Sequence, residues 1–388
     1  MGQAVIQLQA SQQTPGAPRP ALYDLTFNEL RALLTSWGEP EYRARQLWAW
    51  LYKRLPASFD EMTDLPARLR QRLAAETVLH RLRVVAERES SDGGTRKLLL
   101  ELPDGQRIES VLMSYERRRT ACISTQAGCG MGCVFCATGQ MGLLRNLTSG
   151  EIVEQVLFIE RELRQGTPLI GEGSGERSER GLTNIVLMGM GEPLANYGPT
   201  LAALRRLIDP NGFNFGQRRI TLSTVGLVPA IERFSREGLQ VGLAVSLHAA
   251  TDELRNELVP INRRYPLAQL LAACRNYVAR TGRRITFEWA LIRDVNDAPA
   301  QARALVRLIS GLLCHVNVIP LNPTRGYAGA PSTRERVAAF REILERAGIS
   351  CTVRVRRGMD IQAGCGQLRT EVEAARGEGQ PGVQNPGF

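Results

Sequence analysis

Three closely spaced cysteines are the strongest candidates for chemistry in the chain. The segment AGCGMGCVFCATGQMG arranges them as C-x-x-x-C-x-x-C, at Cys129, Cys133 and Cys136. A [4Fe–4S] cluster ordinarily takes one thiolate on each of its four irons. Three thiols would therefore hold one such cluster per chain and leave one iron open to another ligand. Glycines between these thiols let the backbone fold tightly around the sulfurs.

Two alternative roles for the same thiols stay open in the sequence, and both use Cys122 as a fourth ligand. One is a zinc site, the other a four-cysteine electron-transfer cluster. Zinc sites usually take paired C-x-x-C or Cys/His ligands, and no histidine lies nearby. The spacing favours the three-thiol cluster.

Polar residues follow several apolar runs, where a parallel strand would end. In NIVLMGMGEP, glycines such as Gly191 let the backbone approach a ligand, and Glu192 can accept a hydrogen bond from a charged donor. Ser223 lies next to the end of RITLST. Ser246 and His248 lie at the end of GLAVSLH, and Asn322 ends HVNVIPLN. Active sites gather at this edge of βα folds. Simple capping of strand ends is the alternative interpretation.

The elements that must position these residues alternate between strand and helix. Strand-like runs are ACIST, TNIVLMG, RITLST, GLAVSL, RITFEWALI, HVNVIPL and CTVRV, with helical patterns such as SGEIVEQVLFIERELR and PAQARALVRLISGL between them. Repeated βα units predict a parallel sheet with an outer layer of helices. Six or seven units favour the α/β class, with a partial (β/α)6-type barrel.

The N-terminal part predicts a small helical accessory domain, with Thr26 and Glu29 at the spacing of a capping box. Its second helix mixes basic residues with Trp48, Trp50 and Tyr52, which predicts either an RNA-facing surface or, more often for such spacing, core packing. A β-hairpin turning at Pro103-Asp104-Gly105 follows. The expected divisions are a disordered arm (1–21), the helical domain (22–88), the hairpin (89–114), the barrel (115–358), a cysteine loop (359–370) and a flexible tail (371–388). A surface insert is expected at 165–181.

The composition indicates an intracellular protein that binds a polyanion. The net charge is +10, and Lys53 and Lys97 are the only lysines among many arginines. Such a charge favours nucleic acid, although a GC-rich genome also explains the arginines. The chain lacks an apolar run of membrane-spanning length and a signal peptide, so a cytoplasmic protein without membrane contact is expected. Isolated Cys274, Cys314 and Cys351 are expected to be ordinary buried thiols.

The cysteine motif resembles that of the radical S-adenosylmethionine (SAM) superfamily, in which the open iron chelates the amino and carboxylate groups of SAM. The surrounding sequence resembles the RlmN-type rRNA methyltransferases. This likeness runs almost continuously from about residue 107 to 368, through CISTQAGCGMGCVFCATG, NIVLMGMGEPLANY, TLSTVGLVP, AVSLHA and RGMDIQAGCGQL. The helical segment at 22–85 is similar to that family's accessory domain, less sharply.

The resemblance implies a set of site residues. The residues that it assigns to SAM binding are Gly191, Glu192, Ser223, Ser246, Leu247, His248 and Asn322. Cys365 would carry a methyl group, Cys122 would be its disulfide partner, and Glu109 would accept a proton. Without the resemblance, Cys365 is an isolated cysteine and Glu109 an exposed strand carboxylate.

The implied activity is methylation of carbon 2 of an adenine in 23S rRNA (adenosine 2503), with adenosine 37 of tRNA as a further candidate. Two SAM molecules serve each turnover: one methylates Cys365, and the second is cleaved to a radical that activates the S-methyl group. The methylene adds to the ring carbon, and Cys122 then attacks Cys365 to release the product. A flavodoxin- or ferredoxin-type electron donor, a thiol reductant and a monomeric enzyme complete the expectation.

Three alternative functions stay open. A Cfr-type relative would methylate carbon 8 of the same adenine. An electron-transfer iron–sulfur protein would need the cluster thiols alone. An RNA-binding module with a structural zinc would contain zinc and no iron.

Overall fold

One large mixed sheet organises the molecule. The computed structural model describes residues 19–116, 118–166, 181–324 and 326–354. The strands of the sheet are, in spatial order, β1 (Arg83–Glu89), β2 (Thr95–Glu101), β3 (Arg107–Tyr115), β4 (Arg118–Cys122), β7 (Asn184–Leu187), β8 (Ile220–Thr224), β9 (Gly242–Ser246), β10 (Ile285–Leu291), β11 (Cys314–Pro320) and β12 (Cys351–Val353). β1 to β4 pair antiparallel, and from β4 to β12 every pair is parallel.

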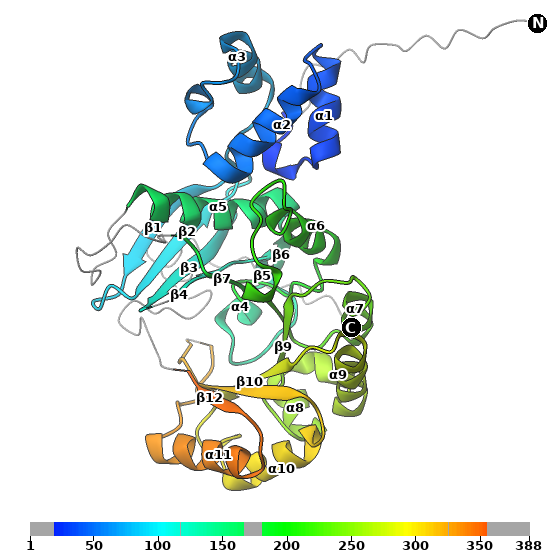
Figure 1. The fold of residues 1–388 in the computed structure, drawn as a ribbon. Coiled ribbons are helices and arrows are strands. Elements are labelled where there is room, and N and C mark those ends of the chain that lie inside the picture. Colours follow the sequence, from blue (N-terminus) through cyan, green and yellow to red (C-terminus); the bar gives the residue numbers. More distant parts are fainter. Residues whose placement is uncertain (1–18, 117, 167–180, 325, 355–388) are drawn as a thin grey trace, which may run out of the picture.

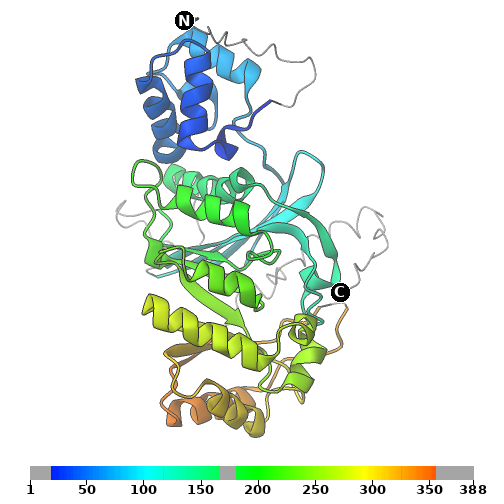
Figure 2. The ribbon, with the colours of Figure 1, turned by 90° about the vertical axis from the view of Figure 1, so that its right-hand side faces the viewer.

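Helices separate the parallel strands, as the strand–helix alternation predicts. They are α5 (Ser149–Gln165), α6 (Tyr197–Leu207), α7 (Val228–Phe234), α8 (Asp252–Leu258), α9 (Leu267–Thr281), α10 (Pro299–Ile309) and α11 (Arg334–Arg346). Most of them form a row along one side of the sheet (Figure 2). The predicted α/β architecture is confirmed: a sheet that is parallel from β4 to β12, extended by antiparallel strands as far as β1, with helices outside.

The two faces of this sheet differ in polarity. Side chains directed toward the helices are buried and apolar, for example Ile185, Leu222, Leu243 and Phe287. Alternate positions on the same strands form the opposite face, called the inner face here. The strand register shows which residues from β2 to β12 lie on this face. Closed barrels of this kind fill their interior with branched apolar side chains. Polar side chains on the inner face are therefore candidates for residues that bind a ligand or take part in a reaction.

The N-terminal helices form a unit at one end of the sheet (Figure 1). They are α1 (Phe27–Ser36), α2 (Tyr42–Ala49), whose last turn continues as a π-helix (Trp50–Arg54), and α3 (Ala67–Glu76). Thr26 and Glu29 form the predicted capping box. Trp48, Trp50 and Tyr52 are buried, so core packing is the correct interpretation of these aromatics.

Buried polar contacts fix the helical unit to the sheet. The Arg206 guanidinium, on α6, donates to the carbonyl oxygens of Tyr23 and Asp24. Asp24 in turn accepts a hydrogen bond from the Gly150 amide at the start of α5, at 2.8 Å. The N-terminal unit is therefore held by backbone contacts as well as by apolar packing.

Several sequence-based boundaries differ from the structure or lie outside it. The expected helical domain (22–88) ends inside strand β1, which begins at Arg83. Ala21, expected in a disordered arm, is buried and bridges to Val78. The predicted hairpin is present as β2 and β3. Most of the arm (1–18) and of the insert (167–180), together with the cysteine loop (359–370) and the tail (371–388), lie outside the described residues.

The isolated cysteines differ in their burial. Cys274 is fully buried, as expected, whereas Cys314 and Cys351 are only half-buried because they begin the strands β11 and β12. Across the described part of the chain, no helix has both the length and the apolar character needed to cross a membrane.

Candidate active site

The three clustered cysteines lie on a loop anchored by a small hairpin. Strand β5 (Gln126–Cys129) pairs antiparallel with β6 (Gly142–Asn146), and the short helix α4 (Ala137–Gln140) lies between them. The Val134 amide donates to the Leu258 carbonyl at the end of α8, at 3.2 Å. The Phe135 ring packs edge-on against the His248 ring, with centroids 4.8 Å apart. The loop is therefore docked over the ends of the parallel strands.

The thiols of this loop lie in buried surroundings and act on one another electrostatically. Burial raises the pKa of Cys129 to about 12 and raises that of Cys133 well above its usual range. Negative charge on Cys136 contributes to both increases, so the sulfurs influence one another. Coordination to metal holds such thiols as thiolates despite burial.

This donor set fits a three-thiolate iron–sulfur cluster. Among the described residues, no three Cys, His, Asp or Glu side chains are arranged to hold a single metal ion. A [4Fe–4S] cube does not require that arrangement, because each thiolate binds a different iron. Cys129 is buried and the other two thiols are half-buried, so the loop can enclose a cluster while leaving a face accessible.

Glu192 is held at the edge of this loop by backbone donors. Its carboxylate oxygens accept from the Leu194 amide at 3.0 Å and the Val225 amide at 2.7 Å, and its own amide donates to Gln126 Oε1 at 2.8 Å. Burial raises the pKa of Glu192 to about 7, although these backbone donors oppose the increase. A nearly buried carboxyl that is half-ionised at neutral pH is suited to pairing with a cationic ligand group.

Gly191 cannot be replaced without moving this turn. It has φ +102°, and an added Cβ would lie 2.5 Å from Gln126 Cβ. L-residues avoid that backbone conformation, and the clash is with a side chain held in place by the strand. The glycine therefore brings the Glu192 turn against β5, as the sequence indicates.

The other strand-end residues meet at the same edge of the sheet. The register pairs Cys122 with Val186, Val186 with Thr221, and Ser223 with Ala244. Ser223 and Ser246 therefore lie on the inner face with Cys122, and both are half-buried. Asn322 is half-buried just beyond the end of β11.

His248 and Leu247 play different parts in this edge. His248 is buried with φ +61°, and its Nδ1 accepts from the Ala290 amide at 3.0 Å. Burial lowers the pKa of His248 to about 3, so the ring is neutral and carries its proton on Nε2. That N–H is a donor available to a ligand. Leu247 is fully buried, and its amide donates to the Glu288 carbonyl at 3.0 Å.

Glu109 differs from the expectation based on its sequence pattern alone. It is 2% exposed, and its Oε2 lies 2.9 Å from Nζ of Lys97, which is fully buried. The register places Lys97 opposite Val111, and Val111 opposite Cys122, so all three share the inner face. Glu109 is two residues from Val111 and therefore lies on that face too. A paired carboxylate and ammonium thus share one face of the sheet with a thiol.

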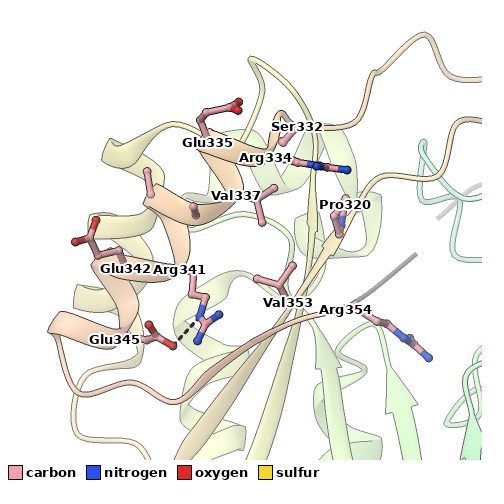
Figure 3. Close-up of a pocket in the computed structure, with 12 residues that line it drawn as sticks. Pro320, Ser332, Arg334, Glu335, Val337, Arg341, Glu342, Glu345, Val353 and Arg354 are labelled. Carbon is pink, nitrogen blue, oxygen red and sulfur yellow. Dashed lines mark hydrogen bonds and ion pairs between the residues drawn. The ribbon is translucent and has the colours of Figure 1, made fainter. Parts of the chain in front are cut away.

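Cys365 lies outside the described residues, which end at Arg354. Next to that end is a surface cavity of about 1030 Å3, lined by α11 and by the ends of β11 and β12 (Figure 3). Charged side chains of α11 dominate its wall. None of the predicted site residues that the structure describes lines it, so the candidate site is the edge of the sheet next to the loop of Cys129, Cys133 and Cys136.

Sequence reasoning missed several residues of the site, most of which have no distinctive signal. Gln126 holds the Glu192 turn, Lys97 pairs with Glu109, and Arg255 is buried near the loop of the three clustered cysteines. Glu288 is buried on the inner face, where the Asn317 amide donates to it at 2.8 Å, and burial raises its pKa to about 7. Lys97 alone had a usable signal, because lysine is so rare in this chain.

Comparison with known proteins places this site in a family. The ribosomal RNA large subunit methyltransferase N-terminal domain matches residues 21–79, and the radical SAM superfamily matches residues 123–305. A dual-specificity RNA methyltransferase RlmN of Myxococcus xanthus is 53% identical, over 91% of this chain and 95% of that protein. A probable dual-specificity RNA methyltransferase RlmN of Chloroflexus aurantiacus is 54% identical, over 89% of this chain and 92% of that protein.

The chain belongs to the RlmN family. A crystal structure of a radical SAM methyltransferase from Sphaerobacter thermophilus shares 52% identity and a TM-score of 0.84, covering 90% of this chain and 98% of that one. The prediction that this RlmN-family chain is a radical SAM RNA methyltransferase is confirmed.

Proposed function

We propose that this enzyme methylates carbon 2 of an adenine in 23S rRNA, and also acts on tRNA, through a methylated Cys365. The relatives are named for dual specificity toward RNA. The observation that carries the proposal is the inner face, where Glu109 and Cys122 lie on the same side of the sheet as Ser223 and Ser246. A base and a second thiol next to a ligand-binding edge are what this chemistry needs.

The cofactors follow from the residues at that edge. Cys129, Cys133 and Cys136 would hold one [4Fe–4S] cluster, which supplies one-electron reduction of the SAM sulfonium when bound. Gly191 and Glu192 would hold the amino group of SAM, because a buried carboxylate accepts hydrogen bonds from the N–H groups of an amine. The remaining polar contacts to SAM would come from Ser223, Ser246, Leu247, His248 and Asn322.

The catalytic roles are divided among three side chains. The Cys365 thiolate first takes a methyl group from one SAM by displacement, and a second SAM serves the radical step. Adenine ring carbons are poor nucleophiles, so carbon–carbon bond formation needs that radical route. Glu109 takes the proton from the ring carbon, and the electron carrier takes up the remaining unpaired electron of the adduct. Cys122 then attacks the Cys365 sulfur, so that a disulfide forms, the bond from that sulfur to the methylene breaks, and the methylene takes up a proton to become the methyl group. A thiol reductant then restores both thiols.

Lys97 explains why a buried carboxylate can serve this purpose. Its ammonium lies 2.9 Å from Glu109 Oε2, and both side chains are excluded from solvent. Pairing with the ammonium fixes the direction of the carboxylate. Glu109 would therefore face the inner side of the sheet as an oriented proton acceptor.

The expected partners are RNA, a flavodoxin- or ferredoxin-type electron donor and a thiol reductant, with the enzyme acting as a monomer. The N-terminal helical unit would contact the RNA backbone. Arg45, Lys53, Arg54 and Arg68 are exposed on it. Phosphate contacts by such side chains supply most of the affinity for nucleic acid.

Substitution of the two thiols outside the cluster tests the proposal. Cys365→Ala should form neither S-methylcysteine nor product. Cys122→Ala should still methylate Cys365 and join it to the base, and then stall as a covalent protein–RNA adduct that mass spectrometry detects after RNase trimming. Iron content is the control, because Cys122→Ala should retain the cluster whereas alanine at any cluster thiol should lose it. If both variants are adduct-free and equally unstable, the two thiols only stabilise the fold.

A further inference from the structure

We propose that Arg255 is a positioning residue for the cluster and the SAM-binding strand ends. One guanidinium joins the ends of β8 and β9 by hydrogen bonds and adds a positive charge beside Cys133. Nothing in its sequence context, on the short helix α8, distinguishes it from the many other arginines. The proposal extends the proposed function but depends only on the cluster and SAM, not on which atom of the base is methylated.

Four hydrogen bonds define its place. Nη2 donates to the Val225 carbonyl at 2.7 Å and to the Ser246 carbonyl at 3.0 Å, and Nε donates to the Leu247 carbonyl at 3.0 Å. Nη1 donates to Asn262 Oδ1 at 2.9 Å. Val225 is the residue whose amide holds the Glu192 carboxylate. The guanidinium therefore fixes the Glu192 contact and the Ser246–Leu247 edge relative to one another.

The burial of this side chain is complete. Arg255 has no exposed surface, and it packs against the turn that follows β8. An added Cβ on Gly226 would lie in ordinary contact with Nη2, at 3.5 Å, and in tight contact with Leu270 Cδ1, at 3.0 Å. Gly226 also has φ +112°, which favours glycine. The turn that places the Val225 carbonyl against the guanidinium therefore favours glycine at its next residue.

The positive charge of Arg255 also needs compensation inside the protein. In the described part of the chain, its guanidinium donates to three carbonyls and an amide but to no carboxylate. A fully buried cation is costly unless negative charge lies nearby. Asp252 lies one hydrogen bond further on, through the Asn262 side chain, and supplies part of that charge. The loop of Cys129, Cys133 and Cys136 contacts the end of the same helix through the Val134 amide, so three cluster thiolates would supply the rest.

Two substitutions separate positioning from charge. Arg255→Lys keeps the cation but cannot bridge three carbonyls and Asn262 with a planar fork. Arg255→Met removes both. Arg206→Met is the matched control, because Arg206 is also a buried arginine that holds two carbonyls, but at the junction with the N-terminal helical unit. Each anaerobically reconstituted protein is assayed for iron, and its SAM affinity is measured by calorimetry. A redox titration gives the cluster potential, and the EPR spectrum is recorded with and without SAM.

The expected results differ among the three variants. Arg255→Lys should keep full iron and the wild-type potential, lose SAM affinity at least tenfold, and show a smaller change of the EPR spectrum when SAM is added. Arg255→Met should also shift the reduction equilibrium against the reduced cluster by about tenfold, ~59 mV for one electron. Arg206→Met should leave iron content, SAM affinity, cluster potential and EPR spectrum unchanged.

The proposal is overturned if folded Arg255→Lys with full iron binds SAM as tightly as wild type. It is equally overturned if Arg206→Met reproduces the loss, which would reduce Arg255 to general stabilisation of the fold. Because Arg255→Lys retains the charge, it keeps the test valid where Arg255→Met is too unstable to purify.

Discussion

Replacing Lys97 by methionine tests whether the Lys97–Glu109 pair is the buried ion pair that the geometry indicates. The two side chains are 0% and 2% exposed and their charged atoms lie 2.9 Å apart, so solvent does not screen them. Removing one partner of a buried pair leaves the other charge poorly compensated, which costs about 3–5 kcal/mol. A protein of this size loses roughly 2 °C of melting temperature per kcal/mol, so a drop of about 6–10 °C is expected.

The double variant Lys97→Met/Glu109→Leu makes this test specific. Replacing both charges with apolar side chains of similar size is often neutral or stabilising, so the double variant should recover most of the lost stability. It should nevertheless form no methylated RNA, because the proton acceptor is gone. Lys53→Met is the control, because Lys53 is exposed and its loss should change stability by no more than ~0.5 kcal/mol.

Thermal and urea unfolding of the cluster-free proteins, followed by circular dichroism, supply the stabilities. Methyl transfer from labelled SAM to RNA supplies the activity. A double variant as unstable as Lys97→Met would contradict the ion-pair interpretation. A double variant that still methylates RNA would remove Glu109 from the mechanism.

Two further predictions concern SAM and RNA. SAM affinity should rise as pH increases through about 7 and level off above it, because the Glu192 pKa is about 7 and only the ionised carboxylate attracts the SAM amine. Below that pH each unit should weaken binding about tenfold, and calorimetry of Glu192→Gln should show weak binding without this pH dependence. Reversing two exposed charges together, Arg45→Glu and Arg68→Glu, should weaken RNA binding and reduce its salt dependence while leaving SAM binding unchanged. Unchanged RNA affinity in filter binding would place the RNA surface on the sheet instead.

The sequence was most informative where the signal is local. The strand–helix alternation predicts each parallel strand, because buried parallel strands are continuous apolar runs between helical patterns. The Thr26 capping box depends on two residues three positions apart, and the three clustered thiols share one loop.

Residues whose role depends on distant neighbours could not be predicted in the same way. Glu109 looks like an exposed strand carboxylate because the sequence does not reveal that Lys97, on the neighbouring strand, faces it. Arg255 looks like a surface arginine on a short helix, yet its partners are carbonyls on two other elements. Glu288 interrupts an apolar run and becomes meaningful only when the register places it beside Asn317.

The most direct test of the central claim is to locate the transferred methyl group. The reconstituted enzyme is incubated anaerobically with methyl-labelled SAM, a reductant and fragments of 23S rRNA or tRNA, and the labelled nucleoside is identified by mass spectrometry and NMR. The proposal predicts label on carbon 2 of a single adenine and none in the Cys365→Ala reaction. Label on carbon 8 would assign the enzyme to the Cfr-type reaction, and cleavage of SAM without labelled RNA would contradict the proposed function.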